Sequence, residues 1–141
     1  MNSVETQKSE LKIQQQIRQA EDEIVIAIET ALDDKQSYGD LQESQFRNLV
    51  RVSQTTDSPE VIKNFLRYQV GREKKWGRGK DSLAEKIITD IDTKLKEKAT
   101  KISQETAEEK MKPIWLELIR RYLGYGSRYL KYLEGERKSK K

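Results

Sequence analysis

The sequence has no cysteine and no histidine among its 141 residues. Disulfides, thiolate metal sites and the usual zinc sites are therefore excluded, because each needs one or both of these residue types. Nucleophile pairs of the Ser–His and Cys–His kinds are excluded as well, so any catalysis would rest on carboxylates, lysines or tyrosines. We expect neither enzymatic activity nor a cofactor or metal, and the absence of cysteine is typical of a cytoplasmic protein.

Proline, glycine and long apolar runs are also scarce. Two prolines and seven glycines are too few for a loop-rich β-sandwich or barrel. No run approaches the roughly 18 apolar residues that a membrane crossing needs, and the first residues, MNSVETQKSELKIQQQ, lack the pattern of a secretion signal. With 34% hydrophobic and 37% charged residues, the composition predicts one domain over residues 1–141 with a lean helical core.

Helical periodicity runs through most of the chain. In the first segment, Ile13, Ile17, Ile24 and Ile28 belong to an apolar face with steps of three and four residues. The predicted helices cover about 5–34, 41–54, 59–75, 82–103, and from 107 or 113 to 134. Because no strand-period alternation stands out, the sequence predicts an all-α bundle of about five helices, with a basic tail at 135–141 that frays.

Local signals mark where these helices begin. Ser58 before Pro59 combines a capping hydroxyl with a proline in the first turn. Ser82 with Glu85, and Thr106 with Glu109, have the spacing of a capping box. The glycines at 124 and 126 weaken the last helix, which predicts a close approach of another backbone there.

Positive charge is concentrated in two blocks. Residues 63–80 contain seven Lys/Arg and one acid, and 112–141 contain nine and three, so each block is net +6. By contrast, 1–62 is net −6 and 81–111 is net −2. Such clustering favours a polyanionic ligand, because cations release the counterions condensed on phosphates.

The first block, KNFLRYQVGREKKWGRGK, has Tyr68 and Trp76 among its cations. Rings of this kind can stack on bases, and the glycines allow backbone N–H groups to approach phosphates. The other interpretation of the block is a solvated helix end running into a loop. Trp76 likewise has two interpretations, as a stacking residue or as a lid over the core.

The second block lies on the last helix. Arg121, Tyr125, Arg128 and Tyr132 follow at steps of 4, 3 and 4, so cations and rings alternate on one face. This face suits a phosphate backbone, although long side chains covering a tyrosine-rich core give the same pattern. The predicted nucleic-acid-binding residues of both blocks are Lys63, Arg67, Arg72, Lys74, Lys75, Trp76, Arg78, Lys80, Arg120, Arg121, Arg128 and Lys131.

Three weaker patterns suggest enzymes and are set aside. Residues 77–81, GRGKD, lack the spacing and the preceding strand of a phosphate-binding loop. Asp90 and Asp92 are two residues apart, so on a helix they do not face each other as paired metal ligands would. Glu73 and Lys75 match a nuclease Glu-x-Lys pair only in residue type, since that pair normally lies on a strand.

A short, cysteine-free, all-helical chain with basic faces resembles the small subunit of CRISPR effector complexes. The segments IWLELIRRYLGYGSRYLKYLEG (114–135) and NFLRYQVGR (64–72) are similar in character to the C-terminal helical part of the large subunit in type I-D Cascade. In that system the small subunit is made by internal translation of the large-subunit gene. The resemblance therefore implies that Met1 is an internal start within a longer reading frame.

The resemblance also implies a non-catalytic role in antiviral defence. Several copies would sit in a ribonucleoprotein beside other subunits, holding the crRNA–target duplex or the displaced strand by backbone contacts, with the acidic N-terminal half facing those subunits. The alternative from the residues is a helical protein-interaction adaptor that binds no nucleic acid and docks through its N-terminal amphipathic helix. The sequence leaves DNA and RNA open as the ligand.

Overall fold

A computed structural model describes residues 3–139 and confirms an all-α fold, with no strand in that range. The main helices are α1 (Ser3–Asp33), α2 (Glu43–Thr55), α3 (Pro59–Arg72), α4 (Leu83–Asp90), α5 (Lys96–Glu105) and α6 (Met111–Ser139). A π-helical turn, η3 (Ile91–Leu95), joins α4 to α5 in one continuous helix, so residues 3–139 form five main helices, as predicted. Short 3₁₀ turns are η1 (Lys35–Ser37), η2 (Lys74–Trp76) and η4 (Glu108–Lys110).

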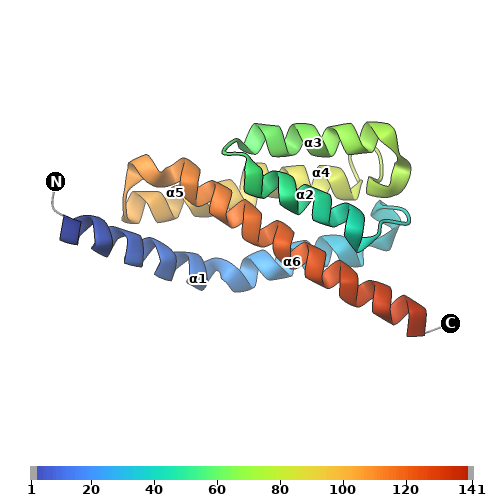
Figure 1. Ribbon diagram of the computed structural model, residues 1–141, viewed down its shortest axis with the longest axis horizontal. Coiled ribbons are helices and arrows are strands. Elements are labelled where there is room, and N and C mark those ends of the chain that lie inside the picture. Colours follow the sequence, from blue (N-terminus) through green and yellow to red (C-terminus); the bar gives the residue numbers. More distant parts are fainter. Residues whose placement is uncertain (1–2, 140–141) are drawn as a thin grey trace.

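The last helix organises the bundle. Figure 1 shows α6 crossing the molecule diagonally, with α1 on one side and α2 on the other. It packs against α1, α2 and α5, and its buried face includes Leu118, Tyr122 and Leu130. The α1 face predicted from periodicity is buried at Ile17, Ile24 and Ile28. Residues from both ends of the chain therefore build one core, and each fully buried Leu or Ile contributes about 1.5–3 kcal/mol.

The helix starts match two of the three predicted signals. Ser58 Oγ accepts a hydrogen bond from the Val61 backbone N–H at 3.2 Å, and Ser82 Oγ accepts one from the Glu85 backbone N–H at the same distance. The predicted box at Thr106 is wrong, because its hydroxyl donates back to the Ile102 carbonyl at 2.7 Å and ends α5 instead. A capping box that was not predicted, between Gln42 and Gln45, starts α2.

The π-helical turn follows from the spacing of the apolar residues. Leu83, Ile87, Ile91, Leu95 and Ala99 are four residues apart and all buried. On a regular α-helix each such step drifts by about 40°, and a wider turn corrects the drift. The π-helical turn interrupts the regular α-helical pattern of backbone hydrogen bonds. At this point the Ile91 carbonyl accepts a hydrogen bond from Trp115 Nε1 at 2.8 Å.

The prediction for the last helix needs two corrections. Helix α6 continues to Ser139 rather than ending near 134, so residues 135–139 belong to this helix, while 140–141 lie outside the described residues. A Cβ on Gly126 would lie 2.8 Å from Ile28 Cγ1 and from the Phe46 ring, whereas nothing lies within 4 Å at Gly124. Of the two glycines, only Gly126 has close neighbours, and these are side chains rather than a second backbone.

Within residues 3–139, no helix combines the length and the apolar character that crossing a membrane requires.

Candidate nucleic-acid interface

Trp76 is part of the core rather than of the surface. Its side chain is 1% exposed, and its ring stacks on Phe46 with centroids 5.5 Å apart and planes inclined by 28°. Phe46 in turn touches α6 at Gly126. A base could not reach this ring without local unfolding, so of the two sequence interpretations the core lid is the one that the structure shows.

The buried Trp76 holds the following loop in a fixed conformation. Gly77 has φ +80°, and a Cβ there would collide with the Ser37 carbonyl oxygen, so only glycine fits. The Gly39 backbone N–H donates to the Lys75 carbonyl at 3.0 Å, which ties η2 to the segment after η1. The cations of this loop are therefore displayed on an ordered backbone.

Five exposed cations lie where α3 ends and this loop begins, at the right of Figure 1. We call this set the basic end; its members are Arg67, Arg72, Lys74, Arg78 and Lys80. None of the five has an acidic partner within residues 3–139. Arg78 donates to the Gly71 carbonyl at 3.4 Å, so the loop folds back on α3. Lys75 is half-buried, and its Nζ lies 3.9 Å from Glu73 Oε2.

Lys63, one of the predicted nucleic-acid-binding residues, does not share this exposed surface. It is 5% exposed, and its Nζ lies 2.7 Å from both Asp92 Oδ1 and Glu60 Oε2. Burial lowers the pKa of Lys63, but the hydrogen bonds to Asp92 and Glu60 outweigh that effect and raise it. The ion pair between the Lys63 ammonium group and Asp92 therefore joins α3 to the π-helical turn.

Two arginines of α6 are also engaged inside the bundle. Arg120 Nε donates to the Ser53 carbonyl at 2.7 Å and its Nη2 to the Thr56 carbonyl at 3.0 Å, which satisfies acceptors at the end of α2. Arg121 lies 2.7 Å from Glu21 on α1 and 2.7 Å from Glu117 on its own helix. The hydrogen bond to Glu117 raises the pKa of Arg121 most. Both side chains have structural partners that a phosphate would have to displace.

Two tyrosines of α6, Tyr125 from this face and Tyr129 beside it, dock on α1. Tyr125 Oη donates to Glu21 at 2.5 Å, and Tyr129 Oη donates to Asp33 at 2.6 Å. Burial, followed by the hydrogen bond to Glu21, raises the pKa of Tyr125. Arg128 remains exposed, with Cζ 5.9 Å from the centre of the Tyr125 ring. The alternating stripe is therefore divided between a packed side and an exposed rim.

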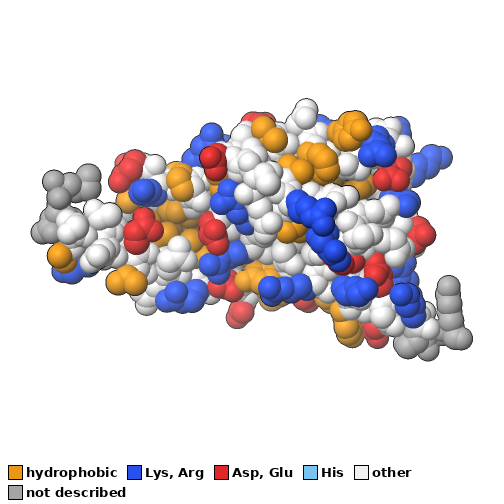
Figure 2. Space-filling view, viewed as in Figure 1, with side chains coloured by type: hydrophobic (Ala, Val, Ile, Leu, Met, Phe, Trp, Pro, Cys, Tyr) orange, Lys and Arg blue, Asp and Glu red, His pale blue; other side chains and the backbone are white. Residues whose placement is uncertain are grey.

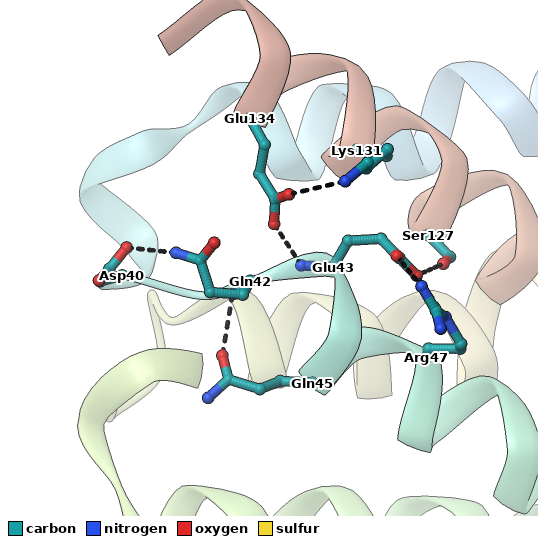
Figure 3. A network of polar contacts seen from close by, with 8 residues as sticks. All are labelled: Asp40, Gln42, Glu43, Gln45, Arg47, Ser127, Lys131 and Glu134. Atoms are coloured by element: carbon teal, nitrogen blue, oxygen red, sulfur yellow. Dashed lines mark hydrogen bonds and ion pairs between the residues drawn. The ribbon is translucent and has the colours of Figure 1, made fainter. Parts of the chain in front are cut away.

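Lys131 belongs to a polar network between α2 and α6 (Figure 3). Its Nζ lies 3.8 Å from Glu134 Oε2, and the other Glu134 oxygen accepts from the Glu43 backbone N–H at 2.5 Å. The Glu43 carboxylate accepts from Ser127 Oγ at 2.8 Å and from Arg47. The bond from Arg47 contributes most to lowering the pKa of Glu43. Lys131 itself stays exposed at the edge of this network.

The acids considered as nuclease ligands have other partners. Asp90 is buried and accepts a hydrogen bond from Tyr122 Oη at 2.7 Å, with Lys86 Nζ 3.5 Å away. Burial and the nearby Asp90 raise the pKa of Tyr122 well above its ordinary value. Asp92 binds Lys63. Within residues 3–139, no three or more acids converge in a way that would hold a metal ion.

The exposed ring of this region is Tyr68, which the sequence analysis named as a possible stacking ring but did not include among the predicted binding residues. Tyr68 is 57% exposed, and the Arg72 guanidinium lies 5.6 Å from the centre of its ring. The sequence signal for this exposure was the position of Tyr68, three residues after Phe65 and four before Arg72, on the outer side of α3. On the face in Figure 2, blue, red and orange side chains are mixed along α6, and orange side chains gather over α3.

Comparisons of the chain with protein-family models, with curated proteins and with solved structures find no match.

Proposed function

We propose that this chain is a non-catalytic nucleic-acid-binding small subunit of a CRISPR RNA-guided interference complex. The observation that carries the binding role is the basic end, where five exposed cations without acidic partners in residues 3–139 lie on the last turns of α3 and on the ordered loop that follows. Unpaired cations bind phosphates at less cost than paired ones, because no ion pair has to break. Arg128 and Lys131 are two further exposed cations, on α6.

Binding of this kind reads the backbone rather than the sequence. Lysine and arginine contacts to phosphates release counterions and carry no base information. In an RNA-guided complex the base pairing of the guide supplies specificity. The subunit would hold a strand or duplex in place while other subunits perform the chemistry.

Assembly in several copies beside other subunits fits the charge distribution of the chain. Residues 1–62 are net −6, while 63–80 and 112–141 are each net +6. Complementary charges speed association and set its register more than they set its affinity. The helical-bundle fold and the likeness of residues 64–72 and 114–135 to the type I-D large subunit support the CRISPR assignment.

A triple variant with a matched control tests the binding role. Arg67→Ala, Lys74→Ala and Lys80→Ala together should weaken binding of unrelated sequences alike, and should lower the salt slope by roughly one unit for each phosphate interaction that they remove. Lys94→Ala, Lys101→Ala and Lys110→Ala remove the same charge from exposed positions on η3, α5 and η4. Fluorescence anisotropy at several salt concentrations gives both slopes. Equal losses of affinity in the two variants would contradict a local site.

The CRISPR assignment has its own test. The tagged protein, purified from its native cell, should bring down crRNA and other effector subunits, and native mass spectrometry should show more than one copy per complex. Recovery of partners without any guide RNA would refute this part of the proposal while leaving the binding role intact.

One observation favours the adaptor as a second candidate. Leu11 and Ile26 on α1 are exposed, at 70% and 62%. A partner helix or groove that covers them would bind through apolar contact, which salt does not weaken. An interaction that persists at high salt and is abolished by Leu11→Ser would support the adaptor.

A further inference from the structure

The outward face of α3 carries a stripe of apolar and aromatic side chains. Val61, Phe65, Tyr68 and Arg72 recur at steps of 4, 3 and 4, which places them on one face of a helix. The rings of Phe65 and Tyr68 have centroids 6.4 Å apart and planes inclined by 42°. Tyr68 is more than half exposed, so its ring meets solvent in the free protein.

The same face adjoins the basic end. Arg67 lies one residue before Tyr68 on α3, and Lys74 follows shortly after α3 ends. An apolar stripe alone would suit another helix, but a ring flanked by unpaired cations is complementary to a polyanion that offers flat apolar groups. Single-stranded nucleic acid has both properties, because its bases are free to stack on aromatic rings. A duplex buries those base faces inside its own stack.

We propose that the outward face of α3 binds single-stranded nucleic acid in preference to duplex. A base would stack on Tyr68, and the flanking phosphates would bind the cations of the basic end. This inference rests on the proposed function, and it selects the displaced strand over the crRNA–target duplex as the ligand of this surface. Tyr68 acts as the stacking residue that Trp76, buried in the core, does not provide.

Arg72 covers the Tyr68 ring in the free protein, but a base can displace it at little cost. Its guanidinium lies over the Tyr68 ring and has no acidic partner within residues 3–139. Moving it aside breaks only an exposed cation–π contact, which is weak in water. Once displaced, it can cover the far side of the stacked base, because guanidinium planes stack on bases as rings do.

The experiment compares one strand and one duplex across four proteins. The ligands are a labelled single-stranded dT 20-mer and a 20-base-pair duplex, titrated at low salt into the full chain by fluorescence anisotropy. The variants are Tyr68→Ala, Tyr68→Phe and, as control, Leu11→Ala. Leu11 on α1 is a large exposed side chain, at 70%, and it lies outside both basic blocks. Circular dichroism checks that each variant is folded.

We expect the wild-type protein to bind the strand more tightly than the duplex. Tyr68→Ala should weaken strand binding roughly 5- to 150-fold, which corresponds to removing one base–aromatic stack, and should leave duplex binding unchanged. Tyr68→Phe should retain strand binding, and Leu11→Ala should change the affinity for neither ligand.

Other outcomes separate the two proposals. Equal affinity for strand and duplex, or an equal loss for both in Tyr68→Ala, would overturn the stacking inference. The stacking inference would also be overturned if Tyr68→Ala bound the strand as tightly as the wild type while the triple cation variant bound it more weakly. The proposed function would then stand, and the apolar stripe of α3 would be assigned to a protein partner. Failure of the wild-type chain to bind either ligand would overturn both.

Discussion

The basic end and the basic face of α6 come from sequence blocks with the same net charge, +6 in each, yet the fold uses them differently. On α6, Arg120 donates to carbonyls of α2 and Arg121 pairs with Glu21, so these charges hold helices together. At the basic end, cations such as Arg67 and Lys74 have no acidic partner within residues 3–139. The availability of a cation is therefore decided by what its helix packs against, which net charge does not reveal.

The two regions are mechanically connected. Gly126 of α6 contacts Phe46, and Phe46 stacks on Trp76, from which the exposed loop follows. The packed helix therefore supports the shape of the exposed surface, and variants along this path should affect stability before they affect affinity.

The largest effect is expected where the basic end is anchored. Trp76→Ala removes a fully buried ring and should lower the free energy of unfolding by about 3–5 kcal/mol. Trp76→Phe should cost less, because it keeps a ring against Phe46 and removes an indole N–H that has no hydrogen-bond partner within residues 3–139. Chemical denaturation measures both. A change near zero in the alanine variant would mean that the loop is not anchored by Trp76.

The next effect separates the two arginine roles directly. Arg120→Ala should lower the free energy of unfolding by about 1.5–3 kcal/mol, because two backbone carbonyls at the end of α2 lose a charged donor. It should leave nucleic-acid affinity unchanged. Arg67→Ala should do the reverse, with stability unchanged and affinity reduced. If Arg120→Ala weakened binding as much as Arg67→Ala, the division between packed and exposed cations would fail.

The two glycines of α6 sharpen the packed side of the comparison. Gly126→Ala should destabilise the protein by about 1–3 kcal/mol, because its methyl group would press on Ile28 and Phe46. Gly124→Ala has open space and should stabilise the protein by about 0.5–1 kcal/mol through helix propensity. Thermal melts of the pair decide this, and effects of the same sign would contradict the packing described for α6.

The smallest effect concerns pH. The pKa of Tyr125 is raised in the folded protein above its ordinary value of 10.0, by burial and by the bond to Glu21. The stability that this tyrosine contributes is therefore fully present below pH 10 and declines as pH rises through the folded pKa. Tyr125→Phe should cost about 1 kcal/mol at about pH 7 and should flatten the decline at higher pH. A wild-type decline that the variant reproduces would assign it to other groups.

The helices could be predicted from sequence because their signals are local. The α1 face at Ile17, Ile24 and Ile28, and the caps at Ser58 and Ser82, depend on spacing within one helix. The candidate site was less predictable, because its outcome depends on residues far apart in the chain. The sequence around Lys63 gives no sign that its partner is Asp92.

The same limit holds on α6, where nothing local to Arg121 indicates Glu21, 100 residues earlier. Tyr68, by contrast, lay on a detectable outer stripe of α3. The predicted binding residues included Trp76 instead, with the core lid as its other interpretation, and the fold places this ring in the core.

The π-helical turn also bears on how this chain tolerates insertions and deletions. Removing the exposed Thr93 would change the apolar steps around Ile91 from four and four to four and three, the spacing of a regular α-helix. The buried faces of α4 and α5 would stay nearly in line, at the cost of the Trp115 bond to the Ile91 carbonyl. The same deletion in the middle of α5 would instead rotate everything after it by about 100°. Length variation among natural relatives of this helix should therefore concentrate in Ile91–Leu95.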